Sequence, residues 1–196
     1  MKKTLLAVAA LCALTSGAAM AQQQDGKWQI RARAVNVDIH NGGVAHAAGL
    51  SVADKTIPEV DISYYFTPNF AAELILTYPQ KMDVKAGGIK AGTVKVLPPT
   101  LTAQYHFTNF GAFKPYVGAG INYTRFSSAK FNDGSPIPLK KSSWGGALQV
   151  GFDYALDKNW SLNFDVKKVY MDTTVVGAGK LKLDPVLVGV GVGYRF

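Results

Sequence analysis

Charged side chains that alternate with apolar ones are the residues of this chain most able to do chemistry. Eight of them stand inside extended apolar stretches: Arg31, Arg33, Glu73, His106, Asp153, Asp165, Lys167 and Arg195. Successive side chains of a β-strand point to opposite faces, so these charges would share one face while hydrocarbon covers the other. Mixed charges gathered on one side of a sheet could form a network of ion pairs or a polar binding site.

Catalytic and metal-binding arrangements are poorly supported. Nucleophilic catalysis needs a Ser or His with an orienting partner, and the only grouped candidates are Asp38, His40, His46 and Ser51, whose spacing fixes no geometry. The histidines lack metal-ligand spacing, and the only cysteine is Cys12. We therefore expect no catalytic residues, no enzyme activity, no metal and no other cofactor.

Eight stretches with a period of two supply the elements that would position the charges. The last is the clearest: from Val186 to Phe196, alternate residues are Val, Val, Val, Val, Tyr and Phe, with mostly glycine between them. The other seven predicted strands cover residues 28–37, 57–66, 70–78, 96–107, 115–126, 143–155 and 160–170. The chain is thus predicted to be all-β.

The connections alternate in length, which is typical of an eight-stranded antiparallel transmembrane β-barrel with short periplasmic turns and long extracellular loops. Short connections cover 67–69, 108–114 and 156–159, and long ones cover 38–56, 79–95, 127–142 and 171–182. Aromatic residues stand at both ends of the apolar face, and we expect no charge on that face between them. A soluble lipocalin-like barrel is the alternative, but the two aromatic belts favour lipid outside.

The first 21 residues have the features of a cleaved signal peptide. Lys2 and Lys3 precede an apolar run, and Ala19-Met20-Ala21 matches a cleavage site after Ala21. Residues 22–196 would then form a single barrel domain with 19 Lys and Arg against 13 Asp and Glu, so the formal charge falls from +8 to +6. Export makes lipid head groups the expected anionic partner, and no nucleic-acid partner is expected.

Five motifs in the same order resemble the OmpW family of small outer-membrane barrels. They are LPPTLTAQYHF (97–107), KPYVGAGINYT (114–124), SWGGALQVGFDY (143–154), YMDTT (170–174) and the terminal GYRF (193–196). The resemblance implies a Gram-negative outer-membrane location and a narrow apolar channel that passes small hydrophobic molecules. Some members of the family serve hydrocarbon uptake and others are bacteriocin receptors.

The predicted lumen divides into a charged lower half and an apolar upper half. An eight-stranded barrel is only just wide enough for its own side chains, so inward residues decide what passes. The lower half collects the charges named at the outset, and the upper half collects Val35, Val37, Ile75, Pro98, Val169, Pro185 and Leu187. Ile75 and Val169 would face each other across the ring and align with the family's apolar gate. The charges could equally be a space-filling plug, and the apolar ring could be plain packing.

Three further features indicate binding partners of the protein or an exit route for a solute. Pro98 and Pro99 cannot donate ladder hydrogen bonds, which predicts a lateral weak point through which an apolar solute could reach the bilayer. Loop lysines would meet lipopolysaccharide phosphates. The terminal Phe196 resembles the signal that outer-membrane assembly machinery recognises; its deletion should lower the yield of heat-modifiable barrel.

Two other functions stay open at this point. A filled structural, receptor or adhesion barrel would conduct nothing, which planar-bilayer recording would show. A barrel enzyme that modifies lipid A would need the loop residues Asp38, His40, His46 and Ser51, and mass spectrometry of lipid A would detect its product.

Overall fold

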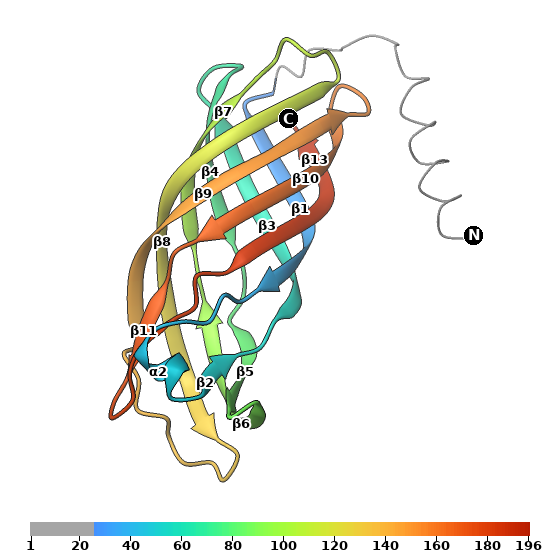
Figure 1. Ribbon diagram of the computed structural model, residues 1–196. Helices are drawn as coiled ribbons and strands as arrows, with labels where there is room; N and C mark the ends of the chain where they lie inside the picture. Colours follow the sequence, from blue (N-terminus) through green and yellow to red (C-terminus); the bar gives the residue numbers. More distant parts are fainter. Residues whose placement is uncertain (1–25) are drawn as a thin grey trace, which may run out of the picture.

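The computed structural model describes residues 26–196, and eight antiparallel strands in it close into a tilted barrel (Figure 1). The predicted signal peptide 1–21, its cleavage site after Ala21 and the first residues of the predicted domain lie outside the described residues. The strands of the wall are β1 (Trp28–Asp38), β3 (Lys55–Tyr65), β4 (Phe70–Leu76), β7 (Thr100–His106), β8 (Phe113–Phe131), β9 (Ser142–Ala155), β10 (Trp160–Val169) and β13 (Val186–Arg195).

The terminal strand closes the ring, as its alternation predicts. β13 pairs with β1 on one side, from Gln29↔Arg195 to Asp38↔Val186, and with β10 on the other. β1 alternates strictly between exposed and buried residues along its whole length. The all-β prediction and the eight-stranded barrel are confirmed.

Most of the predicted long loops are not irregular. The loop end of the barrel, drawn at the bottom of Figure 1, carries further elements. They are the short helix α2 (Val44–Ala47) and the strands β2 (Leu50–Val52), β5 (Gln80–Ala86), β6 (Ile89–Leu97), β11 (Asp172–Val175) and β12 (Gly179–Lys182). β5 and β6 form a hairpin that continues the sheet between β2 and β8, and β11 pairs with β12. The prediction of a plain loop at 79–95 was wrong, because Gln80, Met82 and Val84 alternate inward there as barrel residues do.

The predicted strand 96–107 is also wrong in one respect, since the two prolines divide it. β6 ends at Leu97 and β7 begins at Thr100, and both pair with β8. Proline has no N–H to offer a neighbouring strand, so the ladder stops where Pro98 and Pro99 stand.

One charge lies on the outward face between the two aromatic belts, contrary to expectation. Lys168 follows Val166 and precedes Tyr170 on the outward side of β10, and it is partly buried. Its ammonium donates a hydrogen bond to the carbonyl of Asp184. A lysine near the end of a strand can extend its stem along apolar surface and place its charge at the boundary, which makes this position tolerable.

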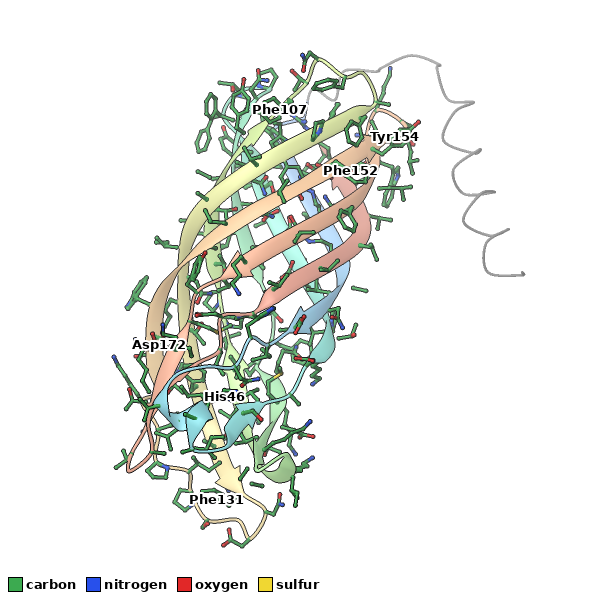
Figure 2. All side chains as sticks on the ribbon, in the orientation of Figure 1. His46, Phe107, Phe131, Phe152, Tyr154 and Asp172 are labelled. Atoms are coloured by element: carbon green, nitrogen blue, oxygen red, sulfur yellow. The ribbon has the colours of Figure 1, made fainter. Side chains whose placement is uncertain are left out.

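Aromatic side chains gather at both ends of the outward face. At the turn end Trp28 packs on Tyr64 and Trp160 on Tyr194, with ring centroids 4.8 and 4.9 Å apart. At the loop end Tyr123 packs on Trp144 at 4.8 Å. Figure 2 shows Phe107, Phe152 and Tyr154 toward the turn end, with Phe131 and His46 toward the loop end. No helix within residues 26–196 is long and apolar enough to cross a membrane.

The tight turns are held by local side chains. In the turn at 156–159, the Asp157 carboxylate accepts hydrogen bonds from the backbone N–H groups of Trp160 and Asn159, at 2.7 and 2.8 Å. These bonds hold the pKa of Asp157 below its usual value. Such self-contained turns keep this end of the barrel short.

Candidate functional site

The charged half of the lumen begins on β1. The register places Arg31 directly opposite Asp61 and Arg33 directly opposite Glu59 on the neighbouring strand β3. On the other side Arg31 faces Gly193 and Arg33 faces Gly191 of β13. Each arginine therefore has a carboxylate on one flank and a glycine without a side chain on the other.

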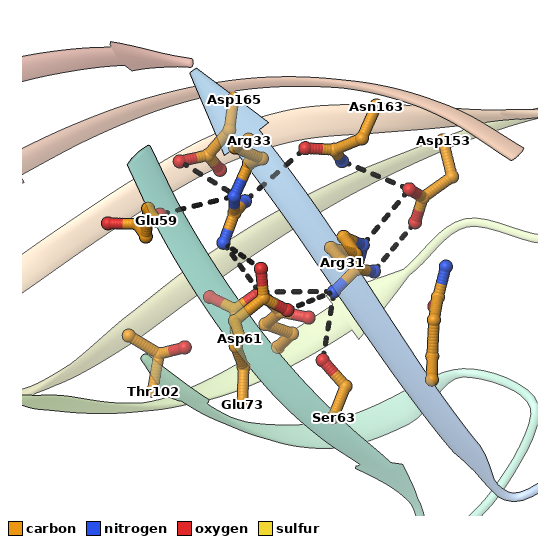
Figure 3. Close-up of polar contacts among 12 residues, drawn as sticks. Arg31, Arg33, Glu59, Asp61, Ser63, Glu73, Thr102, Asp153, Asn163 and Asp165 are labelled. Carbon is orange, nitrogen blue, oxygen red and sulfur yellow. Dashed lines mark hydrogen bonds and ion pairs between the residues drawn. The ribbon is translucent and has the colours of Figure 1, made fainter. Parts of the chain in front are cut away.

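Arg31 is the centre of the network and is fully buried (Figure 3). Its guanidinium holds Asp153 with two nitrogens, Nε–Oδ1 at 3.1 Å and Nη2–Oδ2 at 2.7 Å. Nη1 also lies 3.2 Å from Asp61 and 3.1 Å from Glu73. The planar fork of arginine suits this two-point recognition of a carboxylate. Four strands of the wall are tied together through one side chain.

Arg33 repeats the arrangement one layer higher. Its nitrogens lie 3.1 Å from Glu59, 3.3 Å from Glu73 and 3.7 Å from Asp165. Lys167 completes the layer, with its ammonium 3.4 Å from Glu59 and 3.6 Å from Asp165. Charges buried in this way are tolerable only because each has a partner of opposite sign.

Neutral polar and aromatic side chains fill the lumen beside and below the arginines. The Tyr116 hydroxyl donates to Asp165 at 2.9 Å, and the Tyr65 hydroxyl donates to Gln29 at 2.7 Å. The His106 ring lies between those of Tyr65 and Tyr116, with centroids 5.0 and 4.9 Å apart. The Arg195 guanidinium lies 3.6 Å from the centre of the Tyr65 ring. We call this whole filled region, from Arg195 up to Lys167, the plug.

Above the plug the lumen holds an apolar cavity of about 50 Å³, which we call the chamber. Glu59 and Lys167 at the top of the plug border it, and nearly all other lining groups are hydrocarbon. Six of the seven residues predicted for the apolar upper lumen line it: Val37, Ile75, Pro98, Val169, Pro185 and Leu187. Val35 does not; it is buried one layer lower, opposite Gly189.

A second cavity of about 50 Å³ lies among the loops. It is lined by residues of β2, β5, β6, β8, β11 and β12 together with Ile137 and Leu139. Val52 and Leu183 line both cavities, so they stand between the chamber and the space above it. The Asn41 side chain fixes the backbone of Val52 with hydrogen bonds of 2.7 and 2.9 Å.

The wall of the chamber is interrupted at the two prolines. The ladder between β4 and β7 ends at Ile75↔Thr100, and the ladder between β5 and β6 ends at Gln80↔Val96. On the β8 side the interruption is bridged, because Asn122 Nδ2 lies 3.2 Å from the carbonyls of both Pro98 and Pro99. The unpaired seam therefore lies between residues 76–79 and 97–99.

Several lumen residues were not anticipated from the sequence. Glu59 and Asp61 are buried at 4% and 0% exposure and supply two of the carboxylates around the arginines. Their alternation with Val60 and Ile62 was a sufficient signal for placing them inside. Tyr65 and Tyr116 also face inward, although aromatic residues near strand ends suggest a girdle position.

The loop residues weighed for catalysis do not come together. Within residues 26–196 no hydrogen bond joins Asp38, His40, His46 and Ser51 to one another, and the His46 ring contacts the carbonyl of Leu50 at 3.1 Å. No group of three or more His, Cys, Asp or Glu in the described part of the chain has the arrangement of a metal site.

Comparison with known proteins places these features in a family. The OmpW family model matches residues 24–196. The chain is 50% identical to an uncharacterized outer-membrane protein, y4mB, of Sinorhizobium fredii, over 86% of this chain and 80% of that protein. It is 37% identical to outer membrane protein W of Escherichia coli over the full length of both. The crystal structure of OprG from Pseudomonas aeruginosa superposes with a TM-score of 0.73, at 29% identity, over 91% of this chain and 99% of that one.

Proposed function

The chain belongs to the OmpW family of outer-membrane barrels, and from that premise we propose that it admits small hydrophobic molecules into the chamber from outside. The solute would move down its own gradient, without a cofactor. It would enter past Val52 and Leu183 and contact Ile75 and Val169 on opposite sides of the chamber.

The change from hydrocarbon to charge along the lumen is the observation that carries this proposal. A buried network of ion pairs borders the chamber below and leaves an apolar molecule no favourable way straight down. The chamber, at about 50 Å³, is several times the roughly 10–15 Å³ that one water needs, but smaller than the roughly 150 Å³ of an engineered cavity that binds benzene. A solute of that size would have to displace side chains, which fits a gated path better than an open pore.

The exit we propose is lateral, through the seam between residues 76–79 and 97–99. Pro98 lines the chamber, and so do Thr77 and Gln80 on the other side of the seam. Because proline cannot donate a ladder hydrogen bond, opening the seam breaks fewer backbone bonds than opening the wall elsewhere. The solute would then enter the bilayer without crossing the plug.

Replacing both seam prolines tests this path. We expect P98V/P99V to slow uptake of a small aromatic hydrocarbon into proteoliposomes several-fold, because new N–H groups can pair across the seam. The matched control is Pro58→Val, since Pro58 is an outward-facing proline of β3 that does not line the chamber. Heat-modifiable migration on gels would verify that each variant is folded. Wild-type uptake by the folded double variant would rule out the seam as the exit.

A filled barrel without transport is the second candidate, and the tightly filled plug favours it. It predicts that proteoliposomes with the protein take up no more apolar solute than empty ones.

Three further proposals concern export, membrane insertion and lipid surroundings. We propose that a signal peptide at 1–21 is cleaved after Ala21, that the outer-membrane assembly machinery recognises Phe196, and that lipopolysaccharide lies beside the loops.

A further inference from the structure

Three cations on the outer surface have no acidic partner among residues 26–196. Lys81 on β5, Lys95 on β6 and Arg125 on β8 all point outward, because the residues that flank them on each strand are buried or only partly exposed and face the interior. Each of the three is exposed. They belong to adjacent strands, in the order β5, β6, β8.

The register brings these three charges close together. Lys81 is directly opposite Lys95, which puts their Cβ atoms about 4.5–5.5 Å apart. Lys95 pairs with Ser127 and Leu97 with Arg125, so Arg125 is the diagonal neighbour of Lys95, about 7–8 Å away. The Lys55 ammonium, 3.0 Å from the carbonyl of Lys81, adds a fourth positive charge. Like charges directly opposite one another destabilise a sheet, so a bound anion would stabilise this arrangement.

Two other cations of the loops differ in this respect. Lys90 lies 2.8 Å from Asp83, and Lys180 lies 2.9 Å from Asp172. For Lys81, Lys95 and Arg125 no carboxylate lies within ion-pair distance among residues 26–196. Lys90 and Lys180 are therefore neutralised within the described part of the chain, whereas Lys81, Lys95 and Arg125 are not.

The height of Lys81, Lys95 and Arg125 on the barrel indicates where the anion comes from. Arg125 is two residues beyond Tyr123 on the same face of β8, a rise of about 7 Å along the strand. Tyr123 and Trp144 mark the outer aromatic girdle, which lies at the level of the membrane interface. The three cations therefore lie just outside that interface, where the outer leaflet carries the phosphates of lipopolysaccharide.

We propose that Lys81, Lys95 and Arg125 form a binding site for a lipid A phosphate of lipopolysaccharide. Lysine serves such a site as a point charge, and arginine can grip two phosphate oxygens at once. Leu97 and the seam prolines follow Lys95 directly along the chain, so a lipid held there would border the proposed exit. This inference requires that the long loops lie on the outside of the cell, which the proposed function also requires. It does not require that a solute passes through the barrel.

Native mass spectrometry of the full-length barrel in detergent, titrated with Kdo2-lipid A, tests the site. We expect the triple variant K81Q/K95Q/R125Q to bind this doubly phosphorylated probe at least tenfold more weakly than wild type. The matched control K90Q/K180Q removes two cations that already have carboxylate partners, and it should change binding less than twofold. Heat-modifiable migration verifies folding of both variants.

Dephosphorylated lipid A and phosphatidylglycerol complete the experiment. Wild type and the triple variant should bind the dephosphorylated probe equally, and wild type should prefer Kdo2-lipid A to phosphatidylglycerol. The proposal is overturned if the triple variant binds Kdo2-lipid A as wild type does, if the paired-cation control loses as much, or if phosphatidylglycerol binds equally well. Uptake of solute into vesicles without lipopolysaccharide is a separate readout, so failure of the channel proposal would leave this result unaffected.

Discussion

The plug and the chamber share several strands of the wall and lie at different heights in the lumen. On β1 the inward residues change from Arg31 and Arg33 to Val35 and Val37, and on β4 they change from Glu73 to Ile75. β10 makes the same change between Lys167 and Val169. All three strands switch from charge to hydrocarbon along the same direction of the lumen. The register does not pair these positions directly, since Ile75 lies opposite Asp61 and Lys167 lies opposite Leu187. The boundary between plug and chamber is thus contributed separately by each strand.

The two regions also fill the lumen differently. In the plug, glycines of β13 make room for arginines: a Cβ at Gly191 would lie 2.1 Å from the Ala32 carbonyl oxygen and 2.8 Å from Arg33 Cγ. The arginine side chains thus occupy the volume that these glycines leave. In the chamber the inward residues are medium-sized hydrocarbons, and space remains between them.

Removing Arg31, the central cation of the plug, should have the largest effect on the difference between plug and chamber. In Arg31→Met, Asp61, Glu73 and Asp153 lose their shared partner while staying buried. We expect the free energy of unfolding to fall by about 3–5 kcal/mol, measured by urea titration of the barrel in lipid vesicles. The exposed Arg125→Met is the control and should change it by less than about 0.5 kcal/mol. A loss below about 1 kcal/mol for Arg31→Met would mean that the plug tolerates uncompensated charge.

Adding one methyl group beside the arginines should have the next largest effect. Gly191→Ala forces the backbone and Arg33 apart, which we expect to cost about 1–3 kcal/mol in the same titration. Gly146→Ala is the matched control, because a Cβ added there would lie 3.8 Å from its nearest neighbour, the Gly120 carbonyl oxygen. Equal stabilities of the two variants would show that the plug is not tightly packed around β13.

Filling the chamber should leave stability nearly unchanged and affect passage. Val169→Phe places a ring into the cavity above Lys167, and we expect uptake of a small aromatic hydrocarbon to fall several-fold while the plug persists. Val166→Phe adds the same ring to the outward side of the same strand and should not slow uptake. If both variants take up the hydrocarbon at the wild-type rate, the chamber is not on the path.

Much of this organisation could be predicted from the sequence because a strand repeats every two residues. That period alone separates the outward Val186, Val188 and Val190 from the inward Leu187 and Gly189. The OmpW resemblance, the eight-stranded barrel and the outer-membrane location are all confirmed. We expected no charge on the outward face between the aromatic belts, and this was wrong for Lys168. The same period of two places Lys168 outward beside Tyr170, so its position could have been predicted from the sequence.

Contacts between strands could not be predicted in the same way. The pairing of Arg31 with Asp61 and of Arg33 with Glu59 depends on the stagger between β1 and β3, which no local pattern encodes. Val35 shares the composition of the chamber residues, yet the stagger places it a layer too low to line the cavity. The β5–β6 hairpin was missed because its lysines and glycines have the composition of a loop, although its inward residues alternate as in a strand.

The position at which an apolar solute stops within the lumen gives the most direct test of a closed plug beneath an apolar chamber. Protein labelled at its methyl groups and tyrosine rings, placed in lipid nanodiscs and loaded with a small aromatic hydrocarbon, can be examined for NMR contacts between solute protons and individual methyl groups or rings. We predict contacts to Ile75, Val169 and Leu187 that exceed those to Val190, which faces lipid, and none to the rings of Tyr65 or Tyr116 in the plug. Contacts confined to Val190 and other lipid-facing methyls, or contacts reaching Tyr65 and Tyr116, would contradict a closed plug beneath an apolar chamber.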